Sequence, residues 1–268
     1  MKICINRWIV GLCLLGFGSI AAGGVVFNDT FDVGSSPTIG DDGDDPNDAS
    51  WGILGSGQAL SVDDDGGNNV MGITATSDYR GAKASLSSTV TLADGDSISL
   101  SFKVRATSTP VDLQKGFSFS FYNSAGTGAG EYGYVFLGAW GTQSTANIYE
   151  SSNAGVLSAG ANVDWEGAPA GMFSGTDWHT VSATIERVDS DTLSFSYSVD
   201  GVYVWNDWQR TDPVSTTTFD TIAIGNRATT QSFMLDDINL TVIPEPATIG
   251  LISISAVGLM VVRRALLI

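Results

Sequence analysis

The chain has 268 residues, of which 43% are hydrophobic and only 15% are charged, so it holds enough apolar material for one sizeable core. Its 32 glycines and its many serines and threonines favour strands and turns over helices. The formal net charge of −17 repels nucleic acid and anionic lipid surfaces at long range, which argues against both as partners. A neutral glycan meets no such barrier.

The N-terminus has the three parts of a secretion signal. Lys2 and Arg7 form a basic region, Trp8 to Ile20 an apolar region, and Ser19-Ile20-Ala21 a small-residue cleavage pattern. Residues 1–23 are therefore expected to form a signal helix that the exported protein loses.

Residues 24–243 are predicted to form one all-β domain. In "SISLSFKVR" the apolar residues Ile98, Leu100, Phe102 and Val104 alternate with polar ones, as in a strand with one buried face. Asp200-Gly201 indicates a type I′ hairpin, because both central positions of that turn need positive φ. The acidic stretches at 40–50 and 63–69 lack any apolar period and are predicted to be solvated loops.

Ten to twelve strands at this spacing predict an antiparallel sandwich of two sheets. The order "WHTVSATIE…DTLSFSYSVDGVYV…FDTIAIGN…FMLDDINLTV", with "FNDTFDVG" and "ASWGILG" near the start, resembles a concanavalin A-like or laminin G-like jelly roll. The resemblance implies a jelly-roll sandwich whose first and last strands pair. It implies no particular activity, because this fold carries many functions.

The sequence offers no catalytic set for glycan cleavage, although the resembled fold includes glycoside hydrolases. Those enzymes need two carboxylates on one strand face; the Glu-x-Asp-x-Glu pattern of glucanase members and the Arg-x-Glu-x-Arg strand of alginate-lyase members are both absent. His179, the single histidine, starts a strand without any nucleophile context and is expected to be structural. The protein is therefore predicted not to be an enzyme.

A structural Ca²⁺ site is considered at Asp236 and Asp237, because Ca²⁺ takes several carboxylate and carbonyl oxygens. Asp236 shares the phase of the apolar residues of its strand, so it is expected to be a buried carboxylate that needs a cation or an arginine. Asp29 and Asp32 become co-ligands if the first and last strands pair. The alternative is that Asp236 lies at a solvated strand start.

Sugar binding is expected to use aromatic faces, onto which the apolar face of a pyranose ring packs. The candidates are Trp140, Trp165, Trp205 and Trp208. For each of them, packing in the core is the alternative, since a sandwich of this size also needs aromatic core residues.

The C-terminus combines an apolar run with a basic stop. The 16 residues Ala247 to Val262 form a short transmembrane helix of about 24 Å, and Arg263 and Arg264 hold its end on the cytoplasmic side. With Pro244-Glu245-Pro246 before it, residues 244–268 resemble the PEP-CTERM sorting signal of Gram-negative bacteria. The resemblance implies a transient inner-membrane anchor that an exosortase recognises and removes after export.

The leading hypothesis is a non-enzymatic, exported β-sandwich that binds or is embedded in extracellular polysaccharide. One alternative is a structural matrix or surface protein without a ligand. Another is a divergent glycan-cleaving enzyme, which the missing carboxylate set disfavours.

Overall fold

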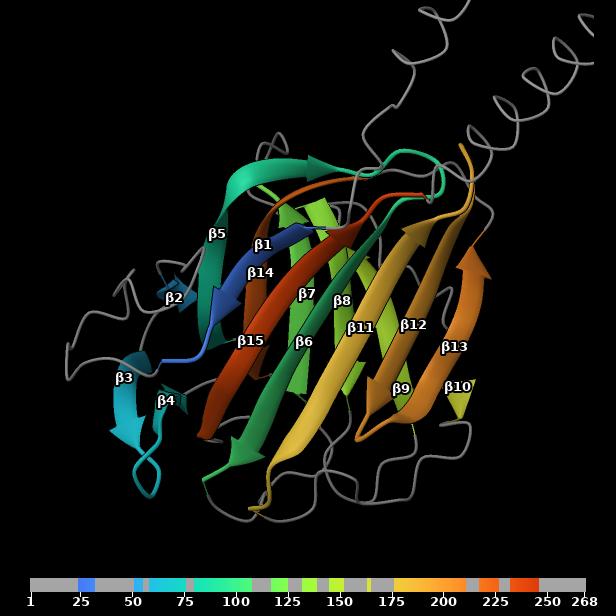
Figure 1. Cartoon of the computed structure of the whole chain (residues 1–268). Helices are drawn as coiled ribbons and strands as arrows, with labels where there is room; N and C mark the ends of the chain where they lie inside the picture. The colour runs from blue at the N-terminus through green and yellow to red at the C-terminus, as the bar shows by residue number, and fades with distance from the viewer. Residues whose placement is uncertain are drawn as a thin grey trace, which may run out of the picture.

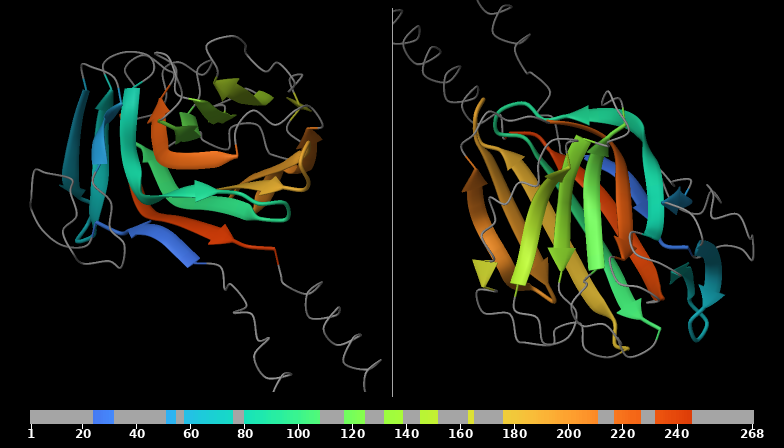
Figure 2. Two further views of the ribbon diagram at one scale, coloured as in Figure 1. Left: turned by 90° about the horizontal axis from the view of Figure 1, so that it is seen from above. Right: turned by 180° about the vertical axis from the view of Figure 1, so that it is seen from behind.

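The computed structural model describes residues 24–31, 51–54, 58–75, 80–107, 117–124, 132–138, 145–151, 163–164, 176–210, 217–226 and 232–245. They form fifteen strands in two antiparallel sheets, and Figures 1 and 2 show the sheets stacked as two layers. The all-β sandwich predicted from the sequence is confirmed. The expected signal helix and the expected transmembrane helix lie outside the described residues, among which no helix is long and apolar enough to cross a membrane.

The larger sheet contains eight strands, which in spatial order are β13 (Val202–Arg210), β12 (Leu193–Val199), β11 (His179–Arg187), β6 (Ser97–Ala106), β15 (Phe233–Ile243), β4 (Asn69–Ala75) and β3 (Gln58–Asp64), with β1 (Gly24–Asp29) also paired to β15. First and last strands therefore pair, as expected, and both lie in this sheet.

The smaller sheet contains seven strands, in the order β10 (Val163–Asp164), β9 (Thr145–Ser151), β8 (Tyr132–Gly138), β7 (Phe117–Asn123), β14 (Thr218–Asn226), β5 (Arg80–Thr91) and β2 (Trp51–Leu54). Its central strands pack their apolar faces against those of the larger sheet.

Aromatic rings join the two sheets through the core. Phe119 of β7 makes edge contacts with Phe102 of β6 and Tyr197 of β12, with ring centroids 5.6 Å and 5.4 Å apart. All three side chains are almost fully buried. Burial raises the pKa of the Tyr197 hydroxyl far above its ordinary value of 10.0, so this group stays neutral.

The two-residue alternation of β6 is confirmed, since its apolar residues are buried and the polar ones between them are half-buried. The predicted hairpin is confirmed as well, because Asp200 and Gly201 have φ values of 52° and 76°. The prediction that residues 63–69 form a solvated loop is confirmed only for residues 65–68, which form the turn between β3 and β4. Asp63 and Asp64 end β3, Asn69 begins β4, and the two strands pair along their length.

Candidate functional site

The outward side of the larger sheet carries a continuous array of small polar side chains. Its eight members alternate with buried apolar residues on four adjacent strands, and each is half-buried. This set, called the hydroxyl face below, comprises Ser196 and Ser198 on β12, Ser182 and Thr184 on β11, Ser99 and Ser101 on β6, and Asn239 and Thr241 on β15.

Antiparallel register aligns the hydroxyl face in two rows that cross the strands. The first row runs Ser198, Ser182, Ser101, Asn239 and ends at Asn28 of β1; the second runs Ser196, Thr184, Ser99, Thr241 and ends at Val25. Neighbours along a row lie close enough to interact: the Thr184 hydroxyl donates to Ser99 Oγ over 3.0 Å, and the Asn239 amide donates to Asn28 Oδ1 over 3.1 Å.

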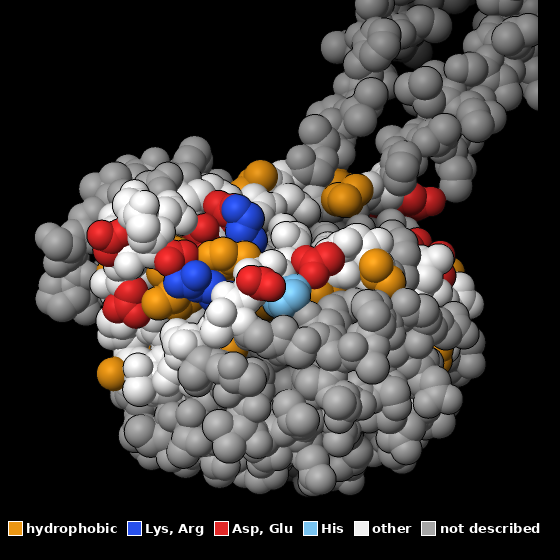
Figure 3. All heavy atoms as spheres, turned by 90° about the horizontal axis from the view of Figure 1, so that it is seen from below, with side chains coloured by type: hydrophobic (Ala, Val, Ile, Leu, Met, Phe, Trp, Pro, Cys, Tyr) orange, Lys and Arg blue, Asp and Glu red, His pale blue; other side chains and the backbone are white. Residues whose placement is uncertain are grey.

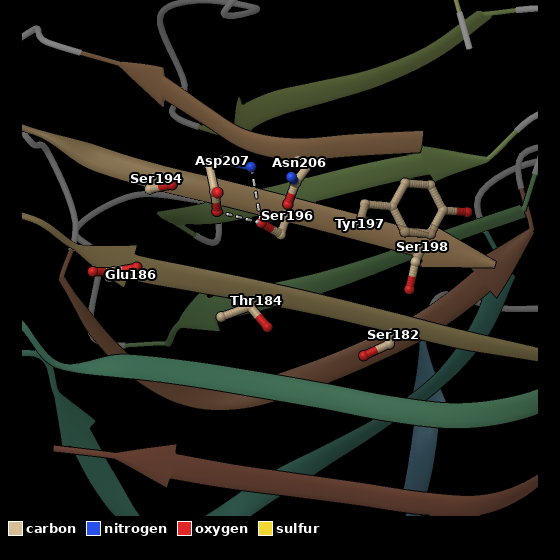
Figure 4. A pocket seen from close by; sticks show the side chains of 9 residues that line it. All are labelled: Ser182, Thr184, Glu186, Ser194, Ser196, Tyr197, Ser198, Asn206 and Asp207. Carbon is tan, nitrogen blue, oxygen red and sulfur yellow. Dashed lines mark hydrogen bonds between the residues drawn. The ribbon is translucent and has the colours of Figure 1, made fainter. Parts of the chain in front are cut away.

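A pocket of about 330 Å³ opens on this face, over β11, β12 and β13 (Figure 4). Its lining is mostly polar and includes the hydroxyl groups of both rows on β11 and β12. Two carboxylates, Glu186 and Asp207, the amide of Asn206, and the side chains of Ser194 and Tyr197 also line it. Such a lining presents many hydrogen-bond donors and acceptors, which suits a ligand rich in hydroxyl groups.

A β-bulge in β13 brings Asn206 and Asp207 to the pocket. Phe195 pairs with Trp208 and Tyr197 with Trp205, so two residues of β13 stand opposite the single residue Ser196. Asp207 adopts the left-handed conformation at φ 53°; its N–H donates to Ser196 Oγ over 3.1 Å, and that hydroxyl lies 3.2 Å from Asp207 Oδ1. Bulges re-aim side chains next to binding sites.

The tryptophans predicted to bind sugar fall in different places. Trp208 packs against the core, with its ring centroid 5.8 Å from that of Phe195, which supports the core alternative. Trp205 lies on β13, but its side chain is outside the described atoms, and Trp140 and Trp165 are outside the described residues. The described part of the pocket lining consists of hydroxyl, amide and carboxylate groups together with Tyr197.

Asp29 has a structural role in the first strand. Its side chain is only 6% exposed; it accepts the Trp51 indole N–H over 2.6 Å and the Phe31 N–H over 3.2 Å. Phe31 has φ 58°, so this carboxylate also holds an unusual backbone turn. Asp32 lies outside the described residues.

Asp236 and Asp237 point to different partners. Asp236 is 5% exposed, as the sequence predicted, and accepts the Asn68 amide over 3.0 Å and the Asp237 N–H over 2.8 Å. Asp237 bulges out of β15 at φ 48° and forms an ion pair with Lys103. Among the described residues, no group of three or more His, Cys, Asp or Glu side chains is placed to hold a metal ion. Since Asp32 lies outside the described residues, the Ca²⁺ site stays a prediction.

Asp236 gives a pH-dependent prediction. Burial raises the pKa of this carboxyl above 3.8, and the charge of Asp237 raises it further, against the opposing effects of its two hydrogen bonds and Lys103. A raised pKa in the folded state makes a contribution to stability that is present at low pH and is lost as pH rises through that pKa. Asp236→Asn should therefore gain stability relative to the natural chain as pH increases. Urea denaturation from ~pH 3.5 to ~pH 7 checks this, and a difference independent of pH would contradict it.

A charged network that the sequence did not reveal closes the end of the sandwich next to the hydroxyl face. Arg105 pairs with Asp65 over 2.5 Å and lies 5.1 Å from the ring centre of Trp178, whose indole N–H donates to Asp65 over 3.0 Å. His179 Nδ1 lies 2.8 Å from Asp200 Oδ2; the structural role expected for this histidine stays a prediction. Figure 3 shows acidic and basic side chains near the histidine on this face of the molecule.

The outward side of the smaller sheet differs from the hydroxyl face. Ser120 and Tyr122 of β7 pair with Ala223 and Thr221 of β14 on this side, and all four are buried. These outward positions of β7 and β14 are therefore closed to solvent, whereas β5 of the same sheet carries exposed polar residues such as Ser87 and Thr89.

The segment that leaves β15 is held against the domain. The Glu245 N–H donates to Asp96 Oδ1 over 2.9 Å, and the Glu245 side chain lies over Gly95, which has φ +85° and no Cβ. Glu245 of the expected sorting motif thus contacts the turn between β5 and β6.

No known family profile matches the sequence, and no curated protein matches it. Several solved structures resemble the fold. An endo-1,3-β-glucanase from Streptomyces sioyaensis has a TM-score of 0.49 and 14% identity over 84% of this chain and 98% of its own. The carbohydrate recognition domain of Emp46p in its metal-free form has a TM-score of 0.45 and 12% identity over 72% and 87%.

An alginate lyase, Aly36B, captured as a mutant with an alginate trisaccharide, has a TM-score of 0.48 and 12% identity over 83% of this chain and 98% of its own. At such identities and TM-scores, these likenesses assign neither activity nor ligand to this chain. The pocket and the hydroxyl face have to support a function by their own chemistry.

Proposed function

We propose that this protein is an exported, non-enzymatic β-sandwich that binds neutral extracellular polysaccharide through the pocket over β11–β13. The observation that carries the proposal is the pocket itself: a recess of about 330 Å³ lined by serine, threonine, asparagine and carboxylate groups on a rigid sheet. Sugar hydroxyl groups both donate and accept hydrogen bonds, and this lining contains acceptors and donors for both.

Charge favours a neutral ligand over an anionic one. The chain carries a net charge of −17, and the charged groups described in the pocket are the carboxylates of Glu186 and Asp207. An acidic polysaccharide would be repelled both at long range and in the pocket. Neutral sugar hydroxyl groups form no ion pairs, but they can donate hydrogen bonds to these carboxylates. Hydrogen bonds to a charged acceptor are stronger than those between neutral groups.

The same two carboxylates support glycan cleavage as the second candidate. A glycosidase uses two carboxyl groups on either side of the scissile bond, and Glu186 and Asp207 border one pocket. Both side chains are exposed, however, whereas a general acid is kept in a water-poor environment. Asp207 is also engaged by the Ser196 hydroxyl. Binding is therefore the better-supported function.

A binding assay with five polysaccharides tests the proposal. The full chain in mild detergent is titrated with dextran, mannan, laminarin and soluble cellulose derivatives, and with alginate as the anionic control. The pocket variant Asn206→Ala/Asp207→Gly should weaken binding of the neutral ligand at least ~10-fold, because it removes several hydrogen bonds while glycine keeps the positive φ. Asp191→Ala, which removes one exposed charge from the turn after β11, serves as the matched control.

Absence of binding to every neutral polysaccharide would overturn the proposal. Release of reducing ends by the natural chain, lost in both Glu186→Gln and Asp207→Asn, would establish cleavage instead.

The route to the cell surface is part of the proposal. Residues 1–23 direct export, residues 247–262 anchor the chain transiently in the inner membrane, and an exosortase cleaves near Pro244-Glu245-Pro246. Supporting this order, the sandwich ends with β15 at Ile243, directly before the motif. Mass spectrometry of the surface protein should find a C-terminus that lacks residues 247–268. A surface form that retains them would exclude tail removal.

A further inference from the structure

We infer that the pocket is one end of a longer binding track, and that its ligand is an extended neutral glycan chain lying across the strands on the hydroxyl face. The inference rests on the proposed function and adds the direction, the length and the class of the ligand. The track starts at Asn206 and Asp207 on β13 and follows the two rows over β12, β11, β6 and β15 to β1.

Register is the first support. A row of outward polar groups across several strands forms only if every pairing keeps the same phase, because a shift by one residue turns a side chain to the other face. The bulge in β15 between Asp236 and Asn239 sits just before the rows begin on that strand. Beyond this bulge, Asn239 and Thr241 fall opposite Ser101 and Ser99. The bulge therefore brings β15 into line with the serines of β6.

Flatness is the second support. The eight residues of the hydroxyl face are all short: serine, threonine or asparagine. Exposed sheets usually carry long charged side chains, which keep other surfaces away. On the strands of this face the described charged groups stand beyond the rows, with Lys103 and Asp237 at one end and Glu186 at the other. The middle is left low and uncharged, open to a ligand that lies flat.

The spacing gives the ligand its direction. Strands in a sheet are about 4.8 Å apart, so the path across five gaps from β13 to β1 is roughly 24 Å. Each successive sugar residue of an extended chain would then lie over the next strand and contact the hydroxyl or amide groups of that strand. A chain along a strand would instead run off the face after two or three outward residues, into the charged groups at its ends.

The chemistry of the rows gives the ligand its class. Hydroxyl and amide groups both donate and accept, as do the hydroxyl groups along the edge of a sugar chain. None of these eight side chains is aromatic, so they offer hydrogen bonds and no stacking surface for the apolar face of a pyranose ring. The chain is therefore held by its hydroxyl edge, and uncharged glycans that stay extended are the ligands that fit.

Chain length and position of the mutation together test the inference. The far-row variant Ser101→Ala/Thr241→Val removes one hydroxyl from each row on β6 and β15, outside the pocket lining. Its matched control is Ser87→Ala/Thr89→Val, which removes an exposed serine and threonine from β5 of the other sheet. Affinities of the full chain are measured for cellobiose and mannobiose and for cellohexaose and mannohexaose.

The natural chain should bind at least one hexasaccharide ~10-fold or more tightly than its disaccharide, through added hydrogen bonds. The far-row variant should lose most of this gain and keep the disaccharide affinity, while the control variant behaves like the natural chain. Equal affinities for both lengths, or a far-row variant that binds hexasaccharides normally, would overturn the inference. If the pocket variant still loses polysaccharide binding in that case, the proposed function stands and only the track is refuted.

Discussion

Replacing Asp29 with alanine is expected to lower the free energy of unfolding by about 2–4 kcal/mol, which is a large effect for a single substitution. The carboxylate is buried and accepts N–H groups from Trp51 and Phe31. Without the Asp29 carboxylate, both N–H groups lose this acceptor while they stay buried. Each buried donor that loses its acceptor lowers the free energy of unfolding by about 1–3 kcal/mol. Urea denaturation monitored by tryptophan fluorescence measures the loss.

Trp51→Phe separates the hydrogen bond from packing. The indole N–H is absent in this variant, so Asp29→Ala should cost less in the Trp51→Phe background than in the natural chain. Asp191→Ala, at an exposed site, should change stability little. A neutral Asp29→Ala would contradict the stabilising role of its hydrogen bonds. Stabilisation of the natural chain, but not of the variant, by Ca²⁺ would make Asp29 a metal ligand.

Gly81→Ala is expected to cost at least ~3 kcal/mol of stability or to prevent folding, because it places a side chain against backbone that cannot yield. Gly81 of β5 stands opposite Gly225 of β14. A Cβ on Gly81 would overlap the Ile224 carbonyl oxygen and the Gly225 Cα, and would lie 2.8 Å from the Ile224 carbonyl carbon. β14 is paired on both sides, with β5 and β7, so it has little room to shift.

Gly52→Ala is the matched control in the neighbouring strand. The nearest atom to a Cβ there is the Lys83 carbonyl oxygen at 3.9 Å, an ordinary contact. Thermal melting of both variants should show a large loss for Gly81→Ala and a small change for Gly52→Ala. Similar melting temperatures for the two would mean that β5 and β14 are less tightly paired than the structure shows.

Local pattern was enough to predict the sandwich. The alternation in β6 reflects one buried and one wet face, which any half-buried strand must show. Asp200-Gly201 likewise specifies its hairpin through backbone preference alone. Pairing of the first and last strands came from the family resemblance, and the register confirms it.

The β3–β4 hairpin was missed because its polar sequence has no apolar period near the turn. Gly66 and Gly67 have positive φ, so "DDDGGNN" does contain a turn. The two strands on either side of this turn, however, extend into the acidic residues. Asp65 contacts Arg105 and Trp178, which lie far away in the sequence. Such partners depend on tertiary pairing and leave no local signal.

The candidate site was missed for the same reason. Alternating serines in "SISLS" and "LSFSYSV" indicated only a wet face; their alignment into rows depends on the register of four strands. The bulge that presents Asp207 was equally hidden, although aspartate tolerates the left-handed conformation better than most residues. A search for aromatic sugar platforms therefore favoured tryptophans over the serines beside them.

The most direct test of the central claim is amide hydrogen exchange of the full chain, with and without a saturating neutral polysaccharide from the panel above. Slowed exchange is expected to centre on β11–β13, with Ser196, Asn206 and Asp207 among the protected amides and with protection extending toward β6. Protection confined to the outward side of β7 and β14, with β11–β13 unchanged, would contradict it and would move the ligand to the smaller sheet.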